Sequence, residues 1–137
     1  AAGQKSGTPP PPDATAAQCI DKIRRHELEL VEQVIRWADD TKICRIAGKY
    51  DRDSHVGTLS LVNTHWETQE VAMTLDQAFE ICVRPGLHCS PYTHQELGTF
   101  PDGTIRISPG HLNTADDISA LCAALAEIGH EVTSAGF

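Results

Sequence analysis

The sequence has few basic residues, few aromatic residues and no long apolar run. Each of these features limits what the protein can bind or how its core can be built. Eleven Lys and Arg face 19 Asp and Glu, for a formal net charge of -8, whereas nucleic-acid-binding proteins neutralise phosphates with a basic surface. No apolar run approaches the roughly 20 residues needed to span a bilayer. With only 5% aromatic residues, the core must be built from Ile, Leu, Val and Ala. We therefore expect no nucleic-acid and no membrane partner.

Cysteine is present, but not in a pattern typical of disulfides or of zinc. The number is odd, the spacing is irregular and no secretory signal precedes the cysteines, which favours free thiols in a reducing, cytoplasmic setting. The five are Cys19, Cys44, Cys82, Cys89 and Cys122. Cys82, His88, Cys89 and His94 lie close in sequence but lack the paired spacing of zinc ligands. We expect no metal site.

The chain has 137 residues, enough for one domain with a core of its own. Residues 1–13 include four successive prolines, which predict an extended, proline-rich arm or linker. Residues 14–137 then form a single domain.

Apolar periodicity predicts three helices and four strands in that domain. The helices are expected at residues 14–37, 68–79 and 115–128, with Gly129 ending the last one. The strands are expected at residues 42–46, 55–62, 80–84 and 104–108. Thr114 and Asp117 have the spacing of a capping box before the last helix. This order favours an α+β fold, with a small, mostly antiparallel sheet and helices packed on one face.

Two side chains are candidates for chemistry. Cys89 lies in a segment rich in Pro, Gly and Ser, which predicts a loop, where reactive groups are often held. A protonated His88 beside it would favour the nucleophilic thiolate, although composition alone favours an inert thiol. Arg106 lies on the strand face opposite Ile105 and Ile107. It either points to solvent or, on an enclosed face, binds an anion, most naturally a carboxylate.

The stretch from Arg84 to Thr114 contains an arginine, a Gly-x-His-Cys segment, a Gly-Thr turn, an x-Arg-x-Ser strand and an Asn-Thr pair before the last helix. These are Arg84, Gly86-Leu87-His88-Cys89, Gly98-Thr99, Ile105-Arg106-Ile107-Ser108 and Asn113-Thr114. The pattern resembles the C-terminal, small domain of pyridoxal-phosphate enzymes of the class V aminotransferase fold, and most of all cysteine desulfurases. The segment KIRRHELELVEQVI resembles the helix that joins the two domains in this family.

The resemblance implies a role for each matching residue. In a cysteine desulfurase, the loop cysteine takes sulfur from the cysteine bound to pyridoxal phosphate and becomes a persulfide, while the strand arginine holds the substrate carboxylate. Cys89 would be the sulfur acceptor and Arg106 the carboxylate clamp, with His88 and Arg84 beside the substrate. Thr8, in a Ser-Gly-Thr-Pro segment similar to one in the family, would contact the phosphate of the cofactor in a neighbouring subunit.

The family's large domain, with its Schiff-base lysine, has no counterpart in this sequence. The resemblance therefore implies that the chain alone binds no pyridoxal phosphate and is inactive. The implied partners are the missing large domain or a companion chain, a second copy in a homo-oligomer and a sulfur-acceptor protein. Two alternatives stay open: a stand-alone binding, regulatory or sulfur-carrier module, and the same domain of a class V aminotransferase or lyase with another reaction.

Overall fold

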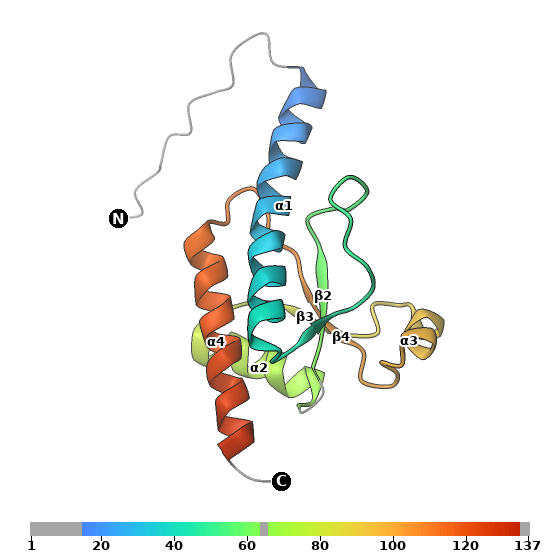
Figure 1. Ribbon diagram of the computed structural model, residues 1–137, viewed down its shortest axis with the longest axis vertical. Coiled ribbons are helices and arrows are strands. Elements are labelled where there is room, and N and C mark those ends of the chain that lie inside the picture. Colours follow the sequence, from blue (N-terminus) through green and yellow to red (C-terminus); the bar gives the residue numbers. More distant parts are fainter. Residues whose placement is uncertain (1–14, 64–65, 135–137) are drawn as a thin grey trace.

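A four-stranded antiparallel sheet with helices on one face organises the chain, as the sequence predicts (Figure 1). The computed structural model describes residues 15–63 and 66–134. Across the sheet the strands are β1 (Arg45–Ile46), β2 (Leu59–Val62), β4 (Thr104–Ile107) and β3 (Arg84–Gly86). The helices are α1 (Ala16–Thr41), α2 (Thr68–Phe79), α3 (Pro91–Leu97) and α4 (Ala115–Ser134). The arm predicted over residues 1–13, including Thr8, lies outside the described residues.

All three predicted helices are present, but the C-terminal ends of α1 and α4 were predicted too early and α3 was not predicted. α1 continues four residues past the expected end at Trp37, and α3 occupies part of the segment predicted to be a loop. Gly129 does not end α4. A Cβ at this position would lie 3.0 Å from Trp66 and 3.2 Å from Ile43. The glycine therefore lets the helix pack closely against its neighbours instead of terminating it.

The strand predicted over residues 80–84 is displaced, since β3 begins only at Arg84. Glu80 takes the left-handed conformation (φ 56°) as the C-cap of α2, and the Ile81 amide donates to the Leu75 carbonyl oxygen at 2.9 Å. These interactions hold the start of the segment to the helix, so it joins no strand. The capping box of α4 is confirmed, since Thr114 N–H donates to Asp117 at 2.8 Å and Asp117 N–H donates to Thr114 Oγ1 at 3.3 Å.

The core lies between the sheet and α1, α2 and α4. Alternate residues of β2 and β4 point into it, and the apolar faces of the three helices cover them. Its most buried members include Val31, Val34, Leu59, Leu61, Leu75, Ile105, Leu121 and Leu125. Each such side chain contributes about 1.5–3 kcal/mol by its burial. Ile20 and Ile23, which the sequence pattern assigns to the same face, are exposed because α1 extends past the sheet (Figure 1).

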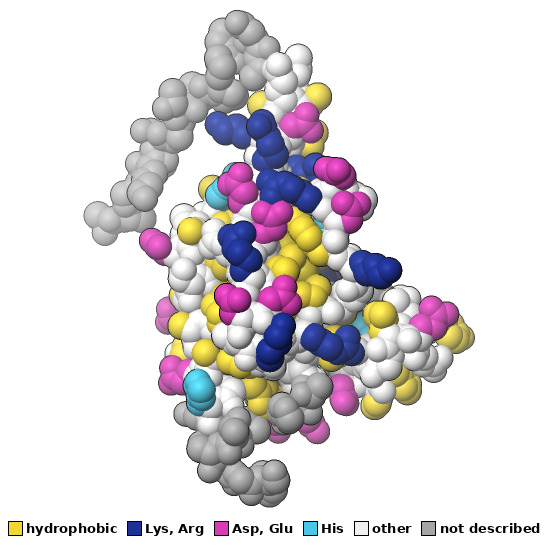
Figure 2. All heavy atoms as spheres, in the orientation of Figure 1, with side chains coloured by type: hydrophobic (Ala, Val, Ile, Leu, Met, Phe, Trp, Pro, Cys, Tyr) yellow, Lys and Arg dark blue, Asp and Glu magenta, His cyan; other side chains and the backbone are white. Residues whose placement is uncertain are grey.

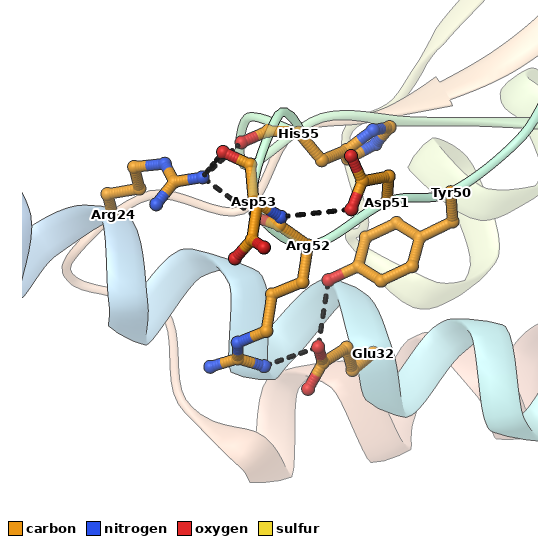
Figure 3. Close-up of polar contacts among 7 residues, drawn as sticks. All are labelled: Arg24, Glu32, Tyr50, Asp51, Arg52, Asp53 and His55. Carbon is orange, nitrogen blue, oxygen red and sulfur yellow. Dashed lines mark hydrogen bonds and ion pairs between the residues drawn. The ribbon is translucent and has the colours of Figure 1, made fainter.

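The loop between β1 and β2 folds back onto α1 through two polar side chains (Figure 3). The Arg24 guanidinium donates to three backbone carbonyl oxygens of this loop, at 2.8, 2.9 and 3.1 Å, on Arg52, Asp53 and His55. Glu32 accepts a 2.8 Å hydrogen bond from the Tyr50 hydroxyl and pairs with Arg52, which lowers the pKa of the Glu32 carboxyl. The loop is thereby attached to α1 at two points.

Charges of both signs are interspersed on the face shown in Figure 2, with hydrophobic side chains visible between them. No broad basic area is present on this face, which agrees with the net charge of -8. Within residues 15–63 and 66–134, no helix is both long and apolar enough to cross a membrane.

Candidate functional site

The face of the sheet opposite the core helices carries a row of polar residues from three neighbouring strands. Ser60 of β2 pairs with Arg106 of β4, and Arg106 pairs with Arg84 of β3. Paired residues in an antiparallel sheet point to the same side. Because Ile105 and Ile107 point into the core, this row points the other way. The sequence predicted the face of Arg106 correctly, and the strand register adds Arg84 beside it.

The two arginines form a cationic site that holds no acid among the described residues. Arg106 is half-buried, and its Nε is buried without a hydrogen-bond partner. Arg84 is exposed on the neighbouring strand. The described part of the chain pairs neither guanidinium with a carboxylate. Like charges on directly paired residues destabilise a sheet, and a bound anion would remove this cost. Carboxylates and phosphates both match the planar donor fork of arginine.

His88 lies beside the arginines and is held by Thr104. Its Nε2 lies 3.2 Å from Thr104 Oγ1, while its Nδ1 is buried without a partner. Burial lowers the pKa of His88, and the nearby charges of Arg106 and Arg84 lower it further. The ring is therefore neutral at neutral pH. Protonation of His88, the condition under which it would favour the Cys89 thiolate, is opposed by burial and by these two arginines.

Cys89 is exposed at the tip of a turn between β3 and α3. His88 and Cys89 have consecutive positive φ values of 49° and 61°, a conformation that costs roughly 1–3 kcal/mol per residue away from glycine. The Ser90 amide closes the turn by donating to the Leu87 carbonyl oxygen at 2.9 Å. The loop position expected from composition is thus observed. Within this turn the Cys89 side chain is exposed, whereas His88 is partly buried.

His94 and Thr99 form a buried support behind this turn that the sequence reasoning did not assign. His94 Nδ1 lies 2.7 Å from Thr99 Oγ1, and the Thr99 amide donates to the His94 carbonyl oxygen at 2.9 Å. The His94 ring centroid is 6.0 Å from that of His88. The Gly98-Thr99 turn in the sequence was the available signal, since it ends α3 and returns the chain to His94.

A comparison with known protein families shows to which family this chain belongs. The sequence model of the family described as aminotransferase class-V matches residues 13–121. The chain belongs to this family. A probable cysteine desulfurase from Methanothermobacter thermautotrophicus is 31% identical to this class-V protein over 110 residues, which are 80% of this chain and 27% of that relative.

Solved structures agree with the class-V assignment. The apo cysteine desulfurase from Thermococcus onnurineus NA1 superposes with a TM-score of 0.72 at 25% identity, over 84% of this chain and 27% of that one. The cysteine desulfurase CsdA from Escherichia coli gives a TM-score of 0.69 at 20% identity, over 87% of this chain and 27% of that one. The class-V chain therefore has the fold of part of a cysteine desulfurase and spans about a quarter of these relatives' length.

Membership of the class-V family implies pyridoxal phosphate for full-length enzymes, and the described residues do not fit that group. A class-V enzyme needs a lysine for the cofactor aldehyde. The described lysines are exposed on α1, at its C-terminal end and in the β1–β2 loop, at positions Lys22, Lys42 and Lys49. None lies on the sheet face of Arg106. In the same ranges, no three His, Cys, Asp or Glu side chains come together as metal ligands.

Proposed function

We propose that this chain supplies the carboxylate clamp and the sulfur-accepting thiol of a cysteine desulfurase. Arg106, assisted by Arg84, binds the carboxylate of a cysteine substrate, and His88 lies beside it. Cys89 accepts the substrate sulfur as a persulfide. A large domain or companion chain outside this sequence binds pyridoxal phosphate and completes the enzyme.

The unpartnered guanidinium of Arg106 is the observation that carries this proposal. A half-buried arginine ordinarily has an acidic partner, because removing its charge from water costs free energy. Arg106 has a buried Nε without a hydrogen bond, and the residue paired with it on β3, Arg84, is also basic. An anionic ligand satisfies this group where no described side chain does. A substrate carboxylate is the ligand that the class-V relatives suggest.

Cys89 suits the second role because it is exposed and precedes a helix that is fixed from behind by His94 and Thr99. In sulfur transfer, the Cys89 sulfur forms a bond to the substrate sulfur while the carbon–sulfur bond of the substrate breaks, and the electron pair stays with the carbon fragment. Pyridoxal phosphate supplies the electron sink for such chemistry. No described residue of this chain provides one.

Native mass spectrometry of the protein purified from its own host tests the proposal. We expect a companion polypeptide with a pyridoxal-phosphate adduct and, after addition of L-cysteine, a mass increase of one sulfur atom on this chain. The increase should disappear in Cys89→Ser and fall in Arg106→Gln, with Cys82→Ser as the matched control. A lone species that gains no sulfur from L-cysteine would refute the assignment.

A stand-alone sulfur carrier is the second candidate, because an exposed cysteine can accept sulfur from a persulfide of another protein or of a small thiol. This function needs Cys89 and does not need Arg106. Glutathione persulfide should then load Cys89 equally in the wild type and in Arg106→Gln. Loading from L-cysteine that depends on both residues favours the desulfurase.

A further inference from the structure

A groove opens on the molecule where β3 and β4 separate, away from Cys89. The ladder between these strands ends at the Arg84–Arg106 pair. Beyond this pair, residues 80–83 and 107–109 diverge and enclose, with the first turns of α4, a pocket of about 480 Å³. Cys89 follows the opposite end of β3. The groove is therefore separate from the turn that carries the proposed sulfur acceptor.

The groove has apolar walls and an acidic rim. Its walls include Phe79, Ile81 and Val83, which are only partly buried and pack against the core. Glu80 and Asp117 lie among its lining residues, which include no Lys and no Arg. Hydrogen bonds from the Thr114 amide and Asn113 lower the pKa of Asp117, so this carboxylate is ionised at neutral pH. The groove thus combines apolar surface with negative charge.

The backbone on both sides of the groove is also available for pairing. Hydrogen-bonded and non-hydrogen-bonded pairs alternate along an antiparallel ladder. Because Pro85 has no N–H, its pair with Ile105 is of the non-hydrogen-bonded kind, and the neighbouring pair Arg84–Arg106 is hydrogen-bonded. Cys82 and Ser108 stand two residues further along each strand, where the next such pair would form. The ladder does not reach them, and no backbone hydrogen bond joins the described residues 80–83 to 107–110.

We propose that this groove binds an extended peptide segment of another polypeptide, with an apolar side chain in the pocket and a Lys or Arg facing Glu80 and Asp117. Extended peptides bind to unpaired strand backbone through main-chain hydrogen bonds, and pockets for alternate side chains give specificity. The basic residue follows from charge complementarity with the rim. A second copy of this chain fits less well, because two acidic grooves on chains of net charge -8 repel each other.

Cys82 provides a built-in reporter for this site, independent of the proposed enzymatic function. It is exposed, it lines the groove, and its thiol donates to Asp76 at 3.6 Å. Cys89 is exposed outside the groove and serves as the internal reference. The experiment follows iodoacetamide modification of both thiols by peptide mass spectrometry, with and without the peptide Ac-Gly-Lys-Val-Leu-Val-Lys-NH2. The matching peptide with Glu in place of Lys is the charge control.

The Lys peptide should slow modification of Cys82 but not of Cys89, with the Cys82 rate about halved when the peptide concentration equals its dissociation constant. Glu80→Gln should raise that dissociation constant about twofold to fivefold, as expected for one exposed ion pair. Ala120→Trp fills the groove from the surface of α4 and should abolish the protection, whereas Ala123→Trp on the same helix should preserve it.

Three outcomes would overturn the proposal. One is the absence of protection by the Lys peptide in folded wild-type protein. Another is equal protection by the Glu peptide, because recognition would then not depend on the acidic rim. The third is slower Cys82 modification at higher protein concentration without peptide, which would make the groove an interface between two copies of this chain. None of these readouts depends on sulfur transfer to Cys89.

Discussion

Replacing Gly103 by alanine tests how closely β3 and β4 must approach beside the candidate site. Gly103 precedes β4 and has a φ of 81°, and a Cβ there would lie 2.7 Å from Gly86 Cα and closer still to the Gly86 carbonyl group. Gly86 ends β3, two residues before His88. Both opposing groups are backbone atoms, so no side-chain rotation can relieve the overlap. Gly103→Ala must therefore push the two strands apart.

The expected cost has two parts, and Gly98 separates them. A left-handed conformation costs an alanine roughly 1–2 kcal/mol relative to glycine, and inserting a methyl group into packed surroundings costs about 1–3 kcal/mol more. Gly98 also has a positive φ, 67°, but a Cβ there meets nothing within 4 Å. We therefore expect about 1–2 kcal/mol for Gly98→Ala and about 2–5 kcal/mol for Gly103→Ala.

Urea denaturation followed by circular dichroism measures both free energies of unfolding. Gly110→Ala, with an ordinary φ and no atom within 4 Å of the added Cβ, is the reference for glycine replacement without strain or overlap. If Gly103→Ala were no more destabilising than Gly98→Ala, the close approach of the strands at Gly86 would not constrain the fold, and the reasoning would be wrong.

Three further predictions concern stability. Arg106→Met should leave the free energy of unfolding unchanged or raise it, because a buried Nε without a partner is removed; a clear loss in thermal unfolding would mean that Arg106 serves the fold. The pKa of His88 is lowered by folding, so the unfolded chain binds more protons, and stability should fall as the pH drops below about 6.5. His88→Asn, which tolerates the positive φ, should reduce that dependence. Leu75→Ala should lower the free energy of unfolding by about 2–5 kcal/mol, because Leu75 is fully buried. Met73 is exposed on the same helix, and Met73→Ala should lower it by less than about 0.5 kcal/mol. Equal losses for the two variants in urea denaturation would contradict the assigned core.

Local patterns in the sequence predicted those features that local interactions determine. The bounds of α2 and the capping box at Thr114 and Asp117 follow from side chains three or four residues apart, and both are confirmed. The face of Arg106 follows from strand alternation and is also confirmed. Features that depend on distant contacts were mispredicted, because a sequence pattern does not show the neighbour. Gly129 continues a helix where Trp66 packs against it.

The composition of the candidate site was only partly predictable for the same reason. A search for reactive side chains finds Cys89 and Arg106 directly. The pairing of Arg84 with Arg106 requires the register of two strands that are distant in sequence. The neutral state of His88 requires knowledge of its burial and of the two guanidinium groups around it. The sequence alone leaves the protonation state of His88 open, because it shows only that His88 stands next to Cys89.

Because α1 extends beyond the sheet, its two halves should differ in how well their amide hydrogens are protected from exchange with solvent. Residues 28–38 include the buried Leu28, Val31 and Val34, whereas the first turns carry exposed Ile20 and Ile23 and are held mainly by polar contacts, including those of Arg24 and His26. Opening of the first turns exposes little additional apolar surface. Their amide hydrogens should therefore exchange with solvent well before those of residues 28–38, and protection of the first turns on binding a partner would locate that partner on this end of the helix.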